Sequence, residues 1–345
     1  TNAPAGIKLE AVTAWLQERV HIEPPITVAL IMGGHSNLTF RVSDSASRQF
    51  VLRRPPLHSV LTTAHDMARE FRIVRALADS SVPVPRLVGM CDDLSVTGAP
   101  FYVMHFVQGI VARDSMLAAT VAEQYRPVAC KNLMTTLSAL HQIVPQDIGL
   151  DDLARSDAYV SRQLRRWMRQ VSASNTRDFP LLHEVHRALV ERTPKQDATG
   201  IVHGDFRLDN CIITRSGDIA AVLDWELCTL GDTRADLGII LAYWVESEDT
   251  LHPLTEPPTV VRGYANRRQL VHWYCKASGC ARESLCIDFF YAFANWRLAC
   301  ILEGVYARYK TAAMGMVPAD VERFPRTAEA LVGRAAATLG GASPI

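Results

Sequence analysis

The stretch "IVHGDFRLDN", residues 201–210, places a histidine, two aspartates and an asparagine within eight positions, directly after an apolar pair. A second stretch, "VLDWE" at residues 222–226, ends an apolar run with Asp224, fourteen residues beyond Asn210. Short apolar runs bounded by turn residues are typical of strands. The two stretches therefore predict polar loops that each adjoin a strand and that are separated by one β hairpin.

The spacing of these polar residues indicates a metal-dependent reaction. Asp205 and Asn210 stand at opposite ends of one tight loop, and Asp224 follows on the next hairpin. One amide oxygen and one carboxylate from different loops suit a Mg²⁺ that keeps several waters and also binds substrate phosphates. Asp205 then remains to accept or orient the proton of an attacking hydroxyl. Aspartates that only cap turns would explain either loop alone, but not both together.

The rest of the chain divides into a β-rich part and a helical part. Before residue 107 we expect a helical segment at 8–20, strands at 26–32, 38–43 and 49–54, an amphipathic helix at 64–80, and two further strands. Beyond Gly109 helical spacing recurs over 119–142, 155–171, 181–192, 234–246, 257–278, 283–310 and 318–338. We therefore predict an α+β, bilobal fold. Residues 1–107 form a small antiparallel β-sheet lobe with one helix, and residues 108–345 form a larger, mainly helical lobe.

The composition is that of a globular protein without a charged partner. The 345 residues are 48% hydrophobic, and 36 basic side chains balance 36 acidic ones. Neither a nucleic acid nor a membrane is therefore expected as a partner. No run is expected to reach the ~20 apolar residues of a membrane helix, and "TNAPAGIKLE" lacks a signal pattern. Eight cysteines without a C-x-x-C pair indicate free thiols. We expect a cytoplasmic protein, and its oligomeric state stays open.

The two loops resemble those of a kinase family. The pattern H-G-D-x-x-x-x-N, followed by a hydrophobic run that ends in Asp, resembles the aminoglycoside phosphotransferase and choline kinase group, small-molecule kinases with a protein kinase-like fold. Gly204 stands where protein kinases carry arginine. The resemblance implies that Asp205 is the catalytic base, that Asn210 and Asp224 bind Mg²⁺, and that ATP is the co-substrate. It also implies that His203 and Asp236 support the catalytic loop.

The resemblance further implies where the nucleotide binds. The glycine-containing turn "MGGHSN" would cover the phosphates through Gly33, Gly34, His35 and Ser36. Arg53, on the third strand, takes the place of the usual lysine, with Glu70 of the helix as its partner. Arg54 is the alternative, because strand alternation does not decide which of the two faces the site. Backbone groups at the hinge between the lobes would pair with adenine, and the candidates are Met104, His105 and Phe106.

The resemblance covers about Gly33 to Tyr309. It is closest to a branch of the family that includes domains fused to acyl-CoA dehydrogenases, and those fused relatives are associated with the phosphorylation of hydroxyacyl-CoA. Other relatives act on antibiotics or amino alcohols.

The acceptor itself is open. Arginine-rich segments at 162–169 and 262–268 favour an anionic small molecule, whereas an aminoglycoside would require a ring of carboxylates. Aromatic residues at helical spacing within 288–309 are either core or the apolar wall of an acceptor cavity; they are Phe289, Phe293, Trp296 and Tyr306.

Two classes of function remain. The first is an ATP-dependent phosphotransferase that acts on an alcohol, either an anionic or lipophilic one such as a hydroxyacyl-CoA, or an antibiotic. The second is a catalytically silent protein with a kinase fold that binds nucleotide and regulates something else. Retention of Asp205, Asn210 and Asp224 favours the first class, and Arg53 in the place of lysine is the feature that favours the second.

Overall fold

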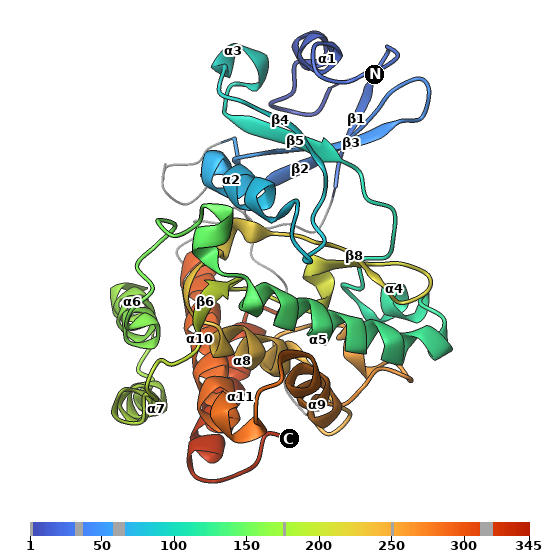
Figure 1. The fold of residues 1–345 in the computed structure, drawn as a ribbon. Helices are drawn as coiled ribbons and strands as arrows, with labels where there is room; N and C mark the ends of the chain where they lie inside the picture. The colour runs from blue at the N-terminus through green and yellow to red at the C-terminus, as the bar shows by residue number, and fades with distance from the viewer. Residues whose placement is uncertain (1–2, 32–36, 58–65, 175–176, 250–251, 311–319) are drawn as a thin grey trace. The chain divides into compact units, whose positions relative to one another are not determined.

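Contacts divide the chain into two compact units. The computed structural model (Figure 1) describes residues 3–31, 37–57, 66–174, 177–249, 252–310 and 320–345. The first unit comprises Thr1–Gln108 and Ala220–Glu226, and the second comprises Gly109–Ile219 and Leu227–Ile345. The segment 220–226 therefore belongs to the first unit, although the chain on both sides of it belongs to the second. The predicted division after residue 107 does not include this return of the chain.

The first unit is built on a five-stranded sheet of order β1-β2-β3-β5-β4, in which every neighbouring pair is antiparallel. Its elements are α1 (Leu9–Gln17), β1 (Thr27–Leu30), β2 (Leu38–Ser43), β3 (Gln49–Arg54), α2 (Met67–Leu77), β4 (Leu87–Cys91), α3 (Leu94–Thr97) and β5 (Phe101–His105). The small antiparallel sheet confirms the predicted fold class.

Strand β3 of this sheet is packed on both of its faces. Phe50 and Leu52 of β3 pack in one apolar cluster with Trp15 of α1. Val51, between them, packs in a second cluster with Met67 of α2 and Tyr102 of β5. Successive side chains of a strand point to opposite faces. Arg53 therefore lies on the face that α2 covers, whereas Arg54 lies on the face of α1.

The second unit is mainly helical, with short strands around the polar loop. Its helices are α4 (Ser115–Ala119), α5 (Arg126–Gln142), α6 (Tyr159–Ser174), α7 (Pro180–Glu191), α8 (Arg234–Tyr243), α9 (Arg267–Ser278), α10 (Ile287–Lys310) and α11 (Arg323–Leu339). Its strands are β6 (Thr199–Val202), β7 (Cys211–Ile213) and β9 (Thr229–Asp232), while β8 (Ile219–Val222) runs into the first unit. Strands β6 and β9 pair antiparallel.

The largest differences between predicted and observed helix starts are those of α5 and α9. Helix α5 begins at Arg126 rather than 119, with a proline in its first turn. Proline is tolerated there because it has no N–H to donate. Helix α9 begins at Arg267 rather than 257, where Asn266 and Gln269 form a reciprocal capping box. Local capping chemistry thus sets the helix starts that apolar periodicity misses.

Helix α10 runs through the core of the second unit. In Figure 1 it lies beside α11, and it also contacts α8, α6 and α7. Among the described residues, Arg282–Lys310 is the one helical segment long and apolar enough to cross a membrane, but 78% of its apolar window is buried. The expectation that no run reaches this length is therefore wrong. The stripe of Phe289, Phe293, Trp296 and Tyr306 is buried, which supports the core interpretation.

Candidate active site

The catalytic loop, His203–Asn210, joins β6 to β7 in the second unit. The Asn210 amide nitrogen donates to the main-chain oxygen of Asp205 at 2.8 Å and to its Oδ2 at 2.9 Å. Arg207 Nε donates to the same Oδ2 at 3.2 Å. Because both donors use Oδ2, Oδ1 of Asp205 is left without a hydrogen bond among the described residues. The predicted base therefore has one oriented oxygen available for a substrate proton.

Arg207 is the neighbour of Asp205 that the sequence did not single out. Its Nη1 also pairs with Asp209 Oδ2 at 3.1 Å, and its guanidinium carbon lies 4.5 Å from the centre of the Tyr243 ring. Burial lowers the pKa of Arg207, but Asp205 and Tyr243 more than offset this and raise it above its ordinary value. Arg207 therefore stays charged and stacked, and fixes the carboxylate of the candidate base.

Asp236, at the start of α8, holds the loop by its backbone. Its Oδ2 accepts from the N–H of His203 at 2.6 Å and its Oδ1 accepts from the N–H of Gly204 at 2.8 Å. Gly204 has a φ of +86°, and a Cβ there would lie 2.7 Å from the carbonyl oxygen of Leu227. Both facts require glycine where protein kinases carry arginine. The predicted support residues His203 and Asp236 are brought together.

Replacing Asp236 with alanine is expected to destabilise the protein by about 2–6 kcal/mol, because two buried N–H groups lose their acceptor at about 1–3 kcal/mol each. Denaturant unfolding of the purified variant measures this. The matched control is Asp151→Ala, at an exposed aspartate of the same unit, which should change stability by less than about 0.5 kcal/mol. Equal stabilities for the two variants would contradict the supporting role.

His141 and Tyr274 extend this support, and the sequence analysis missed both. Nε2 of His141 lies 3.3 Å from Asp236 Oδ2, and its Nδ1 lies 2.7 Å from the Tyr274 hydroxyl. The three residues come from α5, α8 and α9, so no local spacing could have predicted them.

The first unit holds a second cluster of charged side chains, which we call the Arg53 cluster: Arg53, Glu70, Asp224 and Glu226. Nε of Arg53 donates to Glu70 Oε2 at 3.1 Å and its Nη2 donates to Asp224 Oδ1 at 2.5 Å. Glu226 Oε2 lies 3.8 Å from the same Nη2. Asp224 has a φ of +63°, a conformation that is uncommon without glycine and that marks functional loops.

The charges of the Arg53 cluster are coupled. Burial opposes the charge of Arg53, but Glu70 and Asp224 raise its pKa above the ordinary value. Burial raises the pKa of Glu70, and Arg53 only partly offsets this. The guanidinium therefore remains a cation that two carboxylates hold in place. Glu70 is the partner that was predicted for Arg53, whereas the pairing of Arg53 with Asp224 was not predicted.

Arg54, the alternative to Arg53, has a structural role. Its Nη1 donates to the carbonyl oxygens of Gly6 at 2.6 Å and Thr97 at 2.7 Å. It lies on the opposite face of β3 from Glu70 and has no carboxylate partner among the described residues. The structure thus brings Arg53, and not Arg54, to Glu70.

The predicted hinge residues lie at the end of β5. The N–H of His105 donates to Arg86 O at 2.8 Å, and the N–H of Phe106 donates to Gln49 O at 3.1 Å. Burial, with Arg86, lowers the pKa of His105, and Met104 is buried. Adenine recognition by these two N–H groups would therefore require a sheet hydrogen bond to break. Gly33, Gly34, His35 and Ser36 lie outside the described residues.

The arginine-rich segments do not form one binding surface. Arg267 is buried against Glu246 and Asp249, and Arg262 is exposed beside Glu123. The remaining arginines are exposed or partly exposed; they are Arg162, Arg165, Arg166, Arg169 and Arg268. The interpretation of these segments as an acceptor site loses its support.

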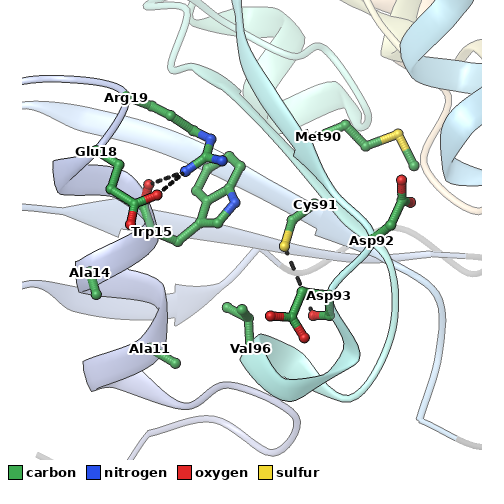
Figure 2. Close-up of a pocket in the computed structure, with 10 residues that line it drawn as sticks. All are labelled: Ala11, Ala14, Trp15, Glu18, Arg19, Met90, Cys91, Asp92, Asp93 and Val96. Carbon is green, nitrogen blue, oxygen red and sulfur yellow. Dashed lines mark hydrogen bonds and ion pairs between the residues drawn. The ribbon is translucent and has the colours of Figure 1, made fainter.

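A depression of about 490 Å³ opens on the first unit beside α1 and the end of β4 (Figure 2). Arg19 lies over the ring of Trp15, with its guanidinium carbon 4.2 Å from the centroid, and pairs with Glu18. Cys91 and Asp93 form the opposite wall. None of the predicted site residues lines this depression, so we assign it no part in the chemistry.

Each of the two predicted metal ligands, taken within its own unit, has an oxygen of the kind that binds magnesium. The hydrogen bonds of the Asn210 amide nitrogen leave its Oδ1 without a hydrogen-bond partner among the described residues. The Asp224 carboxylate is 30% exposed. Mg²⁺ in phosphate-transfer sites is held by one or two such protein oxygens together with waters and phosphate oxygens. In the described part of the chain no group of three or more His, Cys, Asp or Glu side chains gathers for a metal.

Comparison with known proteins identifies the class that these features define. Residues 27–272 match the model of the phosphotransferase enzyme family, and the chain belongs to that family. This confirms the family resemblance on which the residue predictions rest.

Particular relatives narrow the class. The chain is 36% identical over 298 residues to acyl-CoA dehydrogenase family member 10 of Mus musculus. The matched region covers 84% of this chain but 27% of the relative. It thus spans about a quarter to a third of the curated relatives it matches. A Ralstonia eutropha structure, provisionally assigned as an aminoglycoside phosphotransferase, superposes with a TM-score of 0.79 at 29% identity, covering 97% of this chain and 99% of that one. Choline kinase of Cryptosporidium parvum shares the fold with a TM-score of 0.62 at 12% identity, covering 96% and 95%.

Proposed function

We propose that this chain is a small-molecule kinase that moves the γ-phosphoryl group of ATP to the hydroxyl of an acceptor. The observation that carries the proposal is the Asp205 carboxylate, whose Oδ2 is held by Asn210 and Arg207 while Oδ1 has no partner among the described residues. An oriented carboxylate with one available oxygen suits the acceptance of a hydroxyl proton.

In the proposed reaction, one bond to the γ-phosphorus forms and one bond breaks. Asp205 Oδ1 accepts or orients the proton of the acceptor hydroxyl, the hydroxyl oxygen bonds to the γ-phosphorus, and the bond to the β-phosphate oxygen breaks to release ADP. Arg53 is proposed to bind phosphate oxygens through its planar fork, which lysine lacks. In binding phosphate, Arg53 would exchange its partner Asp224 for phosphate oxygens, while Glu70 would keep Arg53 in place. Family membership supports this assignment of roles.

Asn210 and Asp224 are proposed to hold the Mg²⁺ that accompanies ATP. When bound, the ion would neutralise charge on the phosphate oxygens. An aminoglycoside phosphotransferase of the same fold, 15% identical to this chain, holds ADP, which supports an adenine nucleotide as the partner. A cytoplasmic location is part of the proposal and is supported by eight cysteines that are all free thiols.

Mg²⁺-ATP is expected to stabilise the protein against heat, because a ligand that binds only the native state at ~100 times its Kd adds about 2.7 kcal/mol. Thermal unfolding with ATP, with GTP, and with each nucleotide plus Mg²⁺ tests this. Mg²⁺ alone is the control and should have a smaller effect.

Two results would count against the kinase proposal. No shift with either nucleotide at millimolar concentration would contradict nucleotide binding itself. A shift with Mg²⁺-ATP but no phosphate transfer or ATP hydrolysis would favour the silent, regulatory alternative.

A further inference from the structure

Arg297 of α10 is a buried cation with no carboxylate in direct contact among the described residues. Only 6% of the residue is exposed, yet no carboxylate among the described residues lies within 4 Å of its nitrogens. Nη2 donates to the carbonyl oxygen of Gly204 at 2.9 Å. Nε is buried with no hydrogen-bond partner, and Nη1 has none among the described residues. A buried charge is costly unless it is paired.

Other buried arginines of the chain satisfy this requirement in one of two ways. Arg53, Arg234 and Arg267 have carboxylate partners. Arg126 has no carboxylate within 4 Å among the described residues, but its three nitrogens donate to the carbonyl oxygens of Val121, Arg262 and Ala119. Arg297 does neither. Of its five N–H groups, one donates to a carbonyl oxygen, that of Gly204, among the described residues. An anion with several acceptor oxygens would satisfy the remaining N–H donors of Arg297.

Arg297 is hydrogen-bonded to the loop that carries the candidate base. Its hydrogen bond ends on Gly204, the residue directly before Asp205, and consecutive Cα atoms are only ~3.8 Å apart. The Trp167 ring centre lies 5.5 Å from the guanidinium carbon. Burial raises the pKa of both Tyr159 and Tyr243 to about 12, while Arg297 acts in the opposite direction on both. Arg297 therefore lies among aromatic side chains beside the candidate base.

We propose that Arg297 binds an anionic group of the phosphate acceptor, and so makes this enzyme selective for negatively charged alcohols. This inference rests on the proposed kinase function. A guanidinium offers two parallel N–H groups to a carboxylate or phosphate. The same charge disfavours polycationic aminoglycosides and amino alcohols, because like charges in a site of low dielectric repel.

The anionic oxygen has two possible sources, the carboxylate of a free hydroxy acid and the phosphates of a coenzyme A carrier. The experiment compares each charged acceptor with a neutral counterpart. Hydroxy acids of three to eight carbons are paired with their N-methyl amides, and hydroxyacyl-CoAs are paired with the same acyl groups on pantetheine. Amino alcohols form a fifth set. Steady-state kcat and KM are measured with saturating Mg²⁺-ATP.

The native enzyme is expected to prefer one charged class over its neutral counterpart by about 10²-fold in kcat/KM. Arg297→Met should lower kcat/KM much more for the charged acceptors than for their neutral counterparts, mainly through KM, and so reduce this preference. Arg297→Lys should retain part of the preference, because the charge remains while the fork is lost. Arg267→Met is the control, since it removes a buried arginine that has carboxylate partners; it should lower the melting temperature and keep the preference.

Two outcomes would overturn the inference. One is a native enzyme that uses neutral or amino acceptors within about threefold of charged ones, a result that does not depend on whether any variant folds. The other is an Arg297→Met enzyme that loses kcat equally for charged and neutral acceptors and in acceptor-free ATP hydrolysis. That result would assign Arg297 only to the support of Gly204 or to the transferred phosphoryl group. In both cases the kinase function would stand, whereas a protein that binds no nucleotide would fail as a kinase first.

Discussion

Replacing Asp205 with alanine is expected to lower kcat by roughly 10²–10⁴-fold, the usual contribution of a positioned general base. Binding of Mg²⁺-ATP should stay close to that of the native protein, because the available oxygen of Asp205 is assigned to the acceptor hydroxyl. The Asn210 amide keeps its bond to the main-chain oxygen of residue 205 in this variant. Its orientation as a metal ligand should therefore survive. ADP release measures turnover, and calorimetric titration measures binding.

Asp205→Asn is the matched control for folding. It keeps the size of the side chain and one acceptor oxygen for Arg207, but it cannot take a proton. It should melt near the native temperature and lose turnover to a similar extent. If Asp205→Asn keeps native kcat, Asp205 is not the base.

Asp224→Ala is expected to weaken Mg²⁺-dependent ATP binding by about 30-fold or more, the loss typical when a buried charge loses its partner. The reason is that Asp224 would no longer supply an anionic oxygen to the Mg²⁺ that would accompany ATP. The first unit should still fold, because Arg53 keeps its bond to Glu70. Calorimetric titration of ATP with and without Mg²⁺ isolates the metal-dependent part.

Asp92→Ala, at an exposed aspartate of the same unit, serves as the control and should bind Mg²⁺-ATP like the native protein. Asn210→Ala should fall between the two, because a neutral ligand contributes less. A protein in which Asp205→Ala loses nucleotide while Asp224→Ala keeps it would show that the two aspartates have been assigned the wrong way round.

The parts of the site that the sequence could predict are those set by short-range spacing. Asp205 and Asn210 are five positions apart in one loop, and the structure joins them by hydrogen bonds. The Arg53 and Glu70 pair was reached through the family pattern. Strand alternation could not choose between Arg53 and Arg54 because β3 packs against apolar clusters on both of its faces. A strand that is apolar on both faces loses the period of two that reveals its orientation.

Contacts between distant helices could not be predicted in this way. The arginines at 262–268 were predicted to favour an anionic acceptor, but Arg267 is paired with Glu246 and Asp249, about twenty positions away. Arg297 was overlooked, although one signal existed. It is the single charged residue between Phe289 and Cys300 on a helix. A lone charge in a run that is apolar on all sides must be buried, and therefore requires a partner.

The return of residues 220–226 to the first unit has a consequence for how the protein can be dissected. A single cut after Gln108 does not yield two complete halves, because the N-terminal fragment would lack both Asp224 and the Val222 N–H that donates to Pro83 O at 2.8 Å. The chain enters the first unit twice, so neither unit is one continuous segment of the sequence. Gene fusions, linker insertions and exchange of parts with relatives have to transfer the later segment together with the earlier one.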